Sequence, residues 1–126
     1  MSSLIADINL DRQAAKVAQT LVNNKKSKEI ENAITKGLGV LQENGVYACF
    51  LYLLAKEGQI GKAVVDAMLT LFTKMPYKWA HPGKKPEDIL KFICVEVSAD
   101  LEKLLFVKET LEQMLIYARY GAKAKG

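Results

Sequence analysis

The stretch Val46-Tyr-Ala-Cys-Phe-Leu-Tyr-Leu-Leu-Ala55 is the longest apolar run of the chain. A helix that spans a membrane needs about 20 consecutive apolar residues, so this run is too short for one. It is typical instead of a helix that is buried on all sides. Asn44-Gly45 before the run and Gly58 after it are turn signals. We therefore expect a helix over Val46–Lys56 at the centre of the core.

Amphipathic segments flank this central run on both sides. Before it, apolar residues recur at helical spacing and predict helices near Leu10–Asn23 and Lys28–Glu43. After it, the same spacing predicts helices near Ile60–Lys74 and Ala99–Tyr120. The chain is therefore expected to be built from helices that surround one apolar centre.

The segment Glu87–Val97 has two interpretations. Ile89, Ile93 and Val97 follow helical spacing, whereas Phe92-Ile-Cys-Val is also typical of a strand. A single strand is unstable without a partner, and no partner strand is evident in the sequence. We therefore interpret this segment as a helix.

The stretch Met75–Pro86 is the one long loop that the sequence predicts. It holds two aromatic residues, three lysines, all three prolines and the only histidine. Aromatic rings interleaved with lysines can stack on bases and bind phosphates. Loop aromatics more often anchor a loop, however, so we expect Tyr77 and Trp79 to fix it onto the helices. Pro86 suits the first turn of the following helix.

These patterns predict an all-α protein, a single compact bundle of about six helices in one domain over residues 1–126. A chain of 126 residues with 50% apolar composition has enough material for one core. Gly-Ala-Lys-Ala-Lys-Gly at positions 121–126 is expected to form a flexible basic tail.

The charge balance is modestly basic. The chain has 18 Lys and Arg residues against 14 Asp and Glu residues, which hints at an anionic partner without identifying one. The first residues, Met-Ser-Ser-Leu-Ile-Ala-Asp, lack the basic region of a signal peptide. Cys49 and Cys94 both lie in apolar runs, so we expect two buried thiols. A reducing, cytoplasmic location is the simplest expectation.

No arrangement in the sequence is typical of catalysis, and we expect neither an enzyme nor a bound metal or cofactor. His81 and the two cysteines lack the spacing of metal ligands. A nucleophilic pair of Cys49 or Cys94 with His81 is conceivable, but apolar surroundings raise the pKa of a thiol and oppose its activation. Gly37-Leu-Gly39 lacks the third glycine of a dinucleotide-binding motif, and glycine within a helix usually indicates a close contact or a bend.

Arg12 and Lys16 recur at helical spacing on the polar stripe of the first predicted helix. A polar helix face needs cations for solubility, and the same two cations are suited to phosphate contact. The pattern leaves both interpretations open.

Two longer segments carry a family resemblance. The first, Lys36-Gly-Leu-Gly-Val-Leu-Gln-Glu-Asn-Gly-Val-Tyr-Ala-Cys-Phe-Leu-Tyr-Leu-Leu-Ala-Lys56, has one helix ending in Asn-Gly and a Leu/Phe-rich helix ending in Leu-Ala-Lys. The second, Lys108-Glu-Thr-Leu-Glu-Gln-Met-Leu-Ile-Tyr-Ala-Arg-Tyr120, has a basic–Glu pair, a Leu-rich turn and a basic–aromatic end. Both resemble signatures of the small subunit of the Cmr complex, the type III-B CRISPR RNA-silencing machine. Asp11–Ala18 is a weaker echo of that family's basic first helix.

The chain departs from the family pattern at three positions. Leu38 stands where proline is frequent, Ile116 where tryptophan is frequent, and Ala118 where a second basic residue is common. These differences identify a divergent member.

The resemblance implies a helical, non-catalytic structural subunit of a ribonucleoprotein in antiviral defence. Such subunits stack along the backbone subunit and on adjacent copies of themselves, and they contact the phosphates of guide RNA and target RNA. Base pairing, not the protein, then reads the sequence. The matched motifs and the first-helix stripe together give the candidate RNA-binding residues Arg12, Lys16, Lys36, Lys56, Lys108 and Arg119, with Lys84 and Lys85 as second choices.

Other function classes stay open. A small subunit of a type III-A or type I CRISPR complex would share this architecture, so its partners must distinguish it. A helical protein-interaction module that binds no nucleic acid would show a large exposed apolar patch and no coherent basic face. A thiol enzyme would require Cys49 or Cys94 to be exposed near His81.

Overall fold

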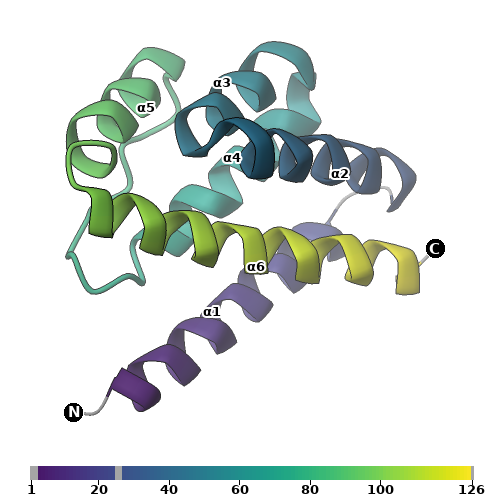
Figure 1. Cartoon of the computed structure of the whole chain (residues 1–126). Coiled ribbons are helices and arrows are strands. Elements are labelled where there is room, and N and C mark those ends of the chain that lie inside the picture. The colour runs from purple at the N-terminus through teal and green to yellow at the C-terminus, as the bar shows by residue number, and fades with distance from the viewer. Residues whose placement is uncertain (1–2, 25–26, 126) are drawn as a thin grey trace.

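The structure, a computed structural model, describes residues 3–24 and 27–125, and all regular secondary structure in these ranges is helical. Six α-helices form the bundle, and a π-helical turn over Ile93–Val97 continues the fifth of them (Figure 1). The helices are α1 (Ser3–Asn23), α2 (Ser27–Asn44), α3 (Val46–Lys56), α4 (Gly58–Phe72), α5 (Pro86–Phe92) and α6 (Leu101–Lys125). The predicted all-α bundle of about six helices is confirmed.

Helix α6 contacts most of the other helices of the bundle. It packs against both α1 and α2, while α4 packs against both α1 and α3. Its buried side chains form one continuous stripe of Val107, Leu111, Met114, Leu115, Ala118 and Ala122. Each large aliphatic side chain buried in this way stabilises the fold by about 1.5–3 kcal/mol. Among the described residues no polar or charged residue is buried, so the core is apolar throughout.

Helix α3 has the predicted bounds, but the prediction that it is buried on all sides is wrong. Phe50 and Leu53 are fully buried, whereas Tyr47 and Leu51 are 41% and 45% exposed. Helix α3 packs against α2 and α4 and lies at the edge of the bundle, so one face stays open (Figure 1). Tyr47 and Leu51 are one helical turn apart and mark that open face.

Two glycines allow α3 to approach its neighbours closely. A Cβ added at Gly61 of α4 would lie 2.1 Å from the carbonyl oxygen of Leu53. A Cβ at Gly37 of α2 would lie 3.1 Å from Leu53 Cδ2, and the Cys49 thiol donates to the Gly37 carbonyl at 3.3 Å. The close helix contact expected near Gly37 is therefore present. Among the described residues, no atom outside the backbone of α2 itself and the two chain neighbours lies within 4 Å of a Cβ added at Gly39, so Gly39 makes no such contact.

The turns around α3 follow the expected glycine signals. Gly45 has a φ of 97° and donates its N–H to the Leu41 carbonyl at 3.1 Å, which closes the end of α2. Gly58 has a φ of 60° between α3 and α4. Glycine adopts this left-handed region without the steric cost that other residues meet there.

The segment after Pro86 is helical, as interpreted from the sequence, but its second half is a π-turn. Ser98 donates its N–H to the carbonyl of Ile93 at 2.9 Å, five residues back. Ile93 and Val97 stay in the core, while Cys94 and Val95 face outward. The expectation that Cys94 is buried is therefore wrong, because the apolar run around it presents only one face to the core.

The last helix is longer than predicted. Helix α6 continues beyond Tyr120 to Lys125, so residues 121–125 are helical and not the expected tail, and Gly126 lies outside the described residues. Ala122 is buried, a Cβ at Gly121 would lie 3.3 Å from Val22, and Lys125 Nζ donates to the Val22 carbonyl at 2.7 Å. Packing on α1 stabilises these final turns.

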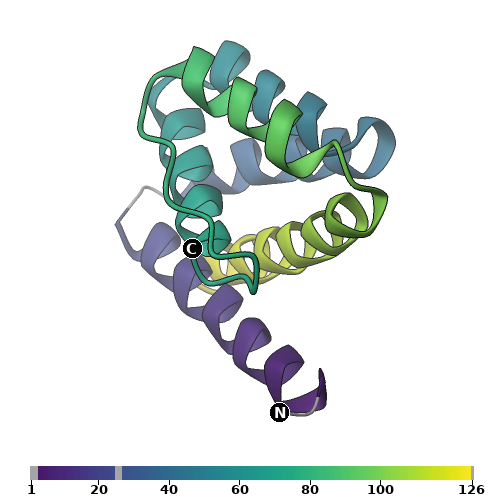
Figure 2. The same cartoon turned by 90° about the vertical axis from the view of Figure 1, so that its left-hand side faces the viewer.

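Helix α1 begins at Ser3, earlier than the predicted start near Leu10. Its N-terminal turns extend beyond the other helices, and its C-terminal half crosses α6 (Figures 1 and 2). The Tyr117 hydroxyl of α6 donates to Asp11 of α1 at 2.6 Å. This contact joins the first and last helices where they pack together.

The long loop is anchored by its aromatic residues, as expected. The Trp79 ring lies 5.6 Å from the rings of both Phe72 and Phe92, measured between centroids. The Tyr77 ring lies 5.6 Å from Phe106 and 4.8 Å from Trp79. These rings connect the loop to α4, α5 and α6. None of the described helices has the length and hydropathy needed to cross a bilayer.

Candidate nucleic-acid interface

A groove of about 580 Å³ runs between α1 and α4 and is bordered by the end of the long loop. Its floor is aliphatic, formed by Val17, Leu21, Leu54, Ala63, Ala67 and Ile89. These side chains come from α1, α3, α4 and α5, so the groove exists only in the folded bundle.

Three lysines line the rim of this groove. Lys16 comes from α1, Lys62 from α4 and Lys84 from the loop that precedes α5, and all three are exposed. Asp66 is the only carboxylate among the described residues that line the groove. The rim therefore has a net positive charge, which favours an anionic ligand.

Helical spacing explains why each helix contributes a stripe to the rim. Lys16 and Thr20 of α1 and Asn24, the residue directly after this helix, follow one another at four-residue intervals. In α4, Lys62 and Asp66 are also four residues apart. Residues at this spacing share one helix face, so packing α1 beside α4 brings the two stripes together.

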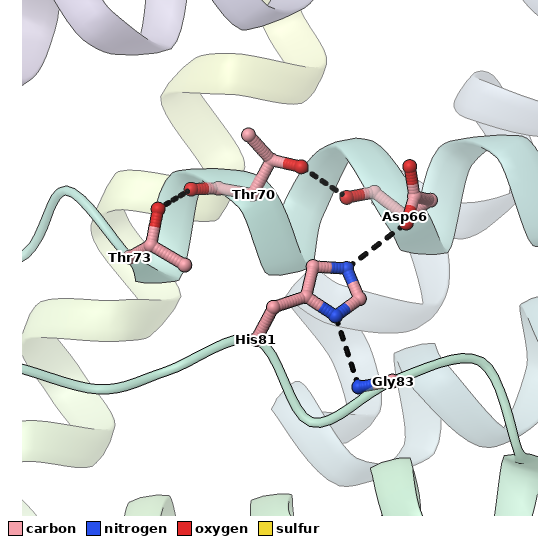
Figure 3. Close-up of polar contacts among 5 residues, drawn as sticks. All are labelled: Asp66, Thr70, Thr73, His81 and Gly83. Atoms are coloured by element: carbon pink, nitrogen blue, oxygen red, sulfur yellow. Dashed lines mark hydrogen bonds and ion pairs between the residues drawn. The ribbon is translucent and has the colours of Figure 1, made fainter.

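His81 fastens the loop to this rim (Figure 3). Its Nε2 lies 2.9 Å from Asp66 Oδ1, and the Gly83 N–H donates to its Nδ1 at 3.0 Å. Because Nδ1 accepts a hydrogen bond, the ring proton of the neutral imidazole lies on Nε2 and is donated to Asp66. The contact occupies the one carboxylate of the groove and holds Gly83, the neighbour of Lys84, beside α4.

The structure brings together only part of the predicted RNA-binding set. Lys16 and Lys84 line the groove, and Arg12 is exposed one helical turn before Lys16. The lining does not include Lys36 of α2, Lys56 at the end of α3, Lys85, or Lys108 and Arg119 of α6.

These outlying residues also differ in exposure. Lys36, Lys56 and Lys85 are exposed, whereas Lys108 and Arg119 are half-buried. The Nε atom of Arg119 is buried without a hydrogen-bond partner. The predicted residues therefore do not form a single groove.

Lys62 belongs to the groove but was not among the predicted residues. In the sequence, Lys62 and Asp66 have the spacing of an ordinary solvated ion pair on a helix surface. In the structure the two residues have different surroundings: Asp66 contacts His81, and Lys62 lies beside the aliphatic floor of the groove. The sequence signal for Lys62 is its place on the polar stripe of α4. This stripe indicates a shared site only when α1 and α4 are known to pack together.

The two cysteines and the histidine that were considered as a nucleophilic pair differ in burial and in contacts. Cys49 is buried, and burial raises the pKa of its thiol to about 12. Cys94 is exposed on the π-turn, while His81 is engaged with Asp66 and Gly83. In residues 3–24 and 27–125, no group of three or more His, Cys, Asp or Glu side chains is placed to hold a metal ion.

Comparisons of this chain with protein-family models, with curated proteins and with solved structures found no match. The resemblance to the Cmr small subunit therefore rests on the two sequence segments quoted above, and the groove is the feature that the fold adds to them.

Proposed function

We propose that the protein is a non-catalytic RNA-binding subunit of a ribonucleoprotein complex, and that the groove between α1 and α4 contacts the RNA backbone. The supporting observation is the convergence of Lys16, Lys62 and Lys84 on one groove from three separate segments. Asp66, the single carboxylate among the described residues of this groove, already contacts His81.

A polyanion suits this rim for a simple physical reason. Each phosphate that a lysine neutralises releases a condensed counterion, and this release favours binding most strongly at low salt. Three such contacts make binding to an isolated subunit weak. A subunit of this kind therefore acts by contributing a few phosphate contacts within a larger assembly.

The sequence resemblance favours the Cmr complex as that assembly. On this proposal the protein works in the cytoplasm in antiviral defence, stacked along the backbone subunit and on adjacent copies, beside guide RNA and target RNA. Exposed apolar side chains support a role in assembly, since Leu101 and Leu105 of α6 are 69% and 52% exposed and one turn apart. Apolar surface of this kind is suited to contact with a neighbouring subunit.

The groove is tested by replacing its lysines together. Fluorescence anisotropy with a labelled single-stranded RNA of mixed sequence is measured over a series of salt concentrations. We expect the triple variant Lys16→Ala, Lys62→Ala, Lys84→Ala to bind more weakly and to lose about two units of salt slope, since each contact contributes about 0.7.

A matched control removes the same charge elsewhere. Lys28, Lys74 and Lys91 are also exposed and are not among the residues that line the groove. Replacing these three with alanine is expected to change the affinity much less. An equal loss of RNA affinity in both triple variants would contradict RNA binding at the groove, because it would show that only the net charge of the protein matters.

A third variant tests the positions that follow from the family resemblance. Lys36→Ala, Lys56→Ala, Lys108→Ala changes the charge by the same amount as the other two. If this variant alone abolishes RNA binding, the RNA-binding surface lies at the family-like positions and the groove assignment is wrong. Single replacements of Arg12 and Lys85, and of the half-buried Arg119, complete the set of candidate residues.

The identity of the complex is tested by purifying the tagged protein from its native cell with its partners. Cmr proteins together with guide RNA are the expected companions. Subunits of a type III-A or type I complex would assign the protein to that machine instead. Protein partners without RNA would favour the helical interaction module.

A further inference from the structure

The floor of the groove has chemistry that phosphate binding does not require. Phosphate is a strongly hydrated anion and gains nothing from aliphatic side chains. Yet Val17, Ala63 and Ala67 line the groove below the lysine rim, and all three are only half-buried. The ligand that matches the whole groove has an apolar face as well as negative charge.

The rim also offers neutral hydrogen-bonding groups on both sides. Thr20 and Asn24 stand on the α1 side and Gln59 on the α4 side, where Thr70 already donates its hydroxyl to the Asp66 carbonyl at 2.9 Å. Asparagine and glutamine amides both donate and accept hydrogen bonds, so they can pair with the edge of any base. Such a rim tolerates all sequences, as a protein that leaves sequence recognition to base pairing requires.

We propose that the groove accepts one unpaired nucleotide, with its base on the aliphatic floor and its phosphates on Lys16, Lys62 and Lys84. Unstacked bases are bound elsewhere between apolar side chains and by hydrogen bonds to their edges. The volume of about 580 Å³ lies within the range of about 300–1,000 Å³ typical of small-molecule sites. This inference rests on the proposed function and names the form of RNA that the groove selects.

The groove would therefore distinguish single strands from duplex. In a duplex both faces of each base are covered by its stacked neighbours, so only the backbone reaches the lysines. In a single strand one base can leave the stack and cover the floor. The rings of Tyr77 and Trp79 are packed against the helices, so the aliphatic floor provides the contact that aromatic stacking provides in other proteins.

The test compares three probes of equal length by fluorescence anisotropy: a single-stranded RNA, the same strand with abasic residues, and a perfect duplex. The wild type is expected to bind the base-bearing strand about tenfold more tightly than either other probe. Filling the floor with Ala63→Phe or Ala67→Phe is expected to abolish this preference while leaving the salt slope unchanged. Ala67→Leu is a smaller replacement in case phenylalanine prevents folding, which circular dichroism reports.

Two controls separate the floor from the rim. Ala99→Phe adds the same ring at an exposed position outside the groove and is expected to keep the preference. The groove-lysine triple variant is expected to lose salt slope but to keep its relative preference for bases over abasic residues.

The outcomes distinguish this inference from the function on which it rests. Equal affinity for base-bearing and abasic strands, with the salt slope intact, would reject the base site and leave phosphate binding standing. A duplex bound as tightly as the single strand would also reject it. Methyl NMR shifts of Val17 and Ala63 that respond to an acidic amphipathic peptide, with no response to RNA, would overturn both proposals.

Discussion

Gly61 is the position at which a single added methyl group has the least room. Its Cβ would lie 2.1 Å from the Leu53 carbonyl oxygen, which is part of the backbone and cannot turn aside. We expect Gly61→Ala to lower the free energy of unfolding by at least about 2 kcal/mol, since α3 and α4 must separate. Urea denaturation followed by circular dichroism measures the change.

Gly39→Ala is the matched control for this prediction. Gly39 is inside α2, and no atom that the structure describes in another helix lies within 4 Å of a Cβ added there. Alanine should therefore raise the free energy of unfolding by about 0.5–1 kcal/mol, because it restricts the unfolded chain. Destabilisation of equal size in both variants would show that the close approach of α3 to α4 is not what makes Gly61→Ala costly.

The two cysteines should differ sharply in reactivity. Burial raises the pKa of Cys49 to about 12, so its thiol stays protonated at pH 8, whereas Cys94 is exposed. We expect one thiol per chain to react with a thiol-specific reagent in the native protein and two in denaturant. Rapid reaction of Cys94→Ser in the native state would contradict the buried position of Cys49.

The sequence could not separate these two cysteines, because both lie in apolar runs. What distinguishes them is which residue of each run faces the core. In α3, Cys49, Phe50 and Leu53 are buried, whereas in the π-turn the buried residues are Ile93 and Val97 and not Cys94. Which residues face the core depends on neighbouring helices and not on local hydrophobicity.

At the scale of elements, the end of α6 gives a further prediction. A chain that stops at Tyr120 loses the buried Ala122, the contact of Gly121 with Val22, and the Lys125 hydrogen bond to the Val22 carbonyl. We expect the free energy of unfolding to fall by about 2 kcal/mol, from lost apolar burial and a lost charged hydrogen bond. Lys123→Ala, at an exposed position of the same helix, should change it little.

Helix bounds could be predicted where turn residues mark them and not where packing extends a helix. Helix α3 begins and ends as expected, because Gly45 and Gly58 adopt positive φ on either side of it. The end of α6 was predicted too early because the short basic stretch 121–126 was expected to be a flexible tail. In the fold Gly121 serves a close approach to α1, which the sequence of α6 alone does not reveal.

At the scale of the whole molecule, the only tryptophan is an internal reporter of folding. Trp79 packs against Phe72 of α4 and Phe92 of α5, and its neighbour Tyr77 packs against Phe106 of α6. If all helices unfold as one domain, tryptophan fluorescence and far-ultraviolet circular dichroism should give the same urea midpoint. Two separate midpoints would show that part of the bundle unfolds independently.

Only part of the candidate site could be predicted, because the groove arises from the packing of the whole molecule. Lys16 was chosen from the polar stripe of its helix and Lys84 from its loop, and the fold brings both to one groove. Lys62 and the aliphatic floor were missed, because a groove is a property of two helices in contact. Single-helix patterns give its components but not their arrangement.

The π-turn at Ile93–Val97 has a consequence for how this chain is compared with others. A π-turn closes its hydrogen bond over five residues and therefore holds one residue more than a turn of α-helix. A homologous protein lacking one of the positions 94–96 would keep Ile93 and Val97 on the same side of an unbroken α-helix. An alignment with such a protein that allows no gap inside the helix would shift every later residue by one position, including Lys108–Tyr120, one of the two segments that carry the family resemblance.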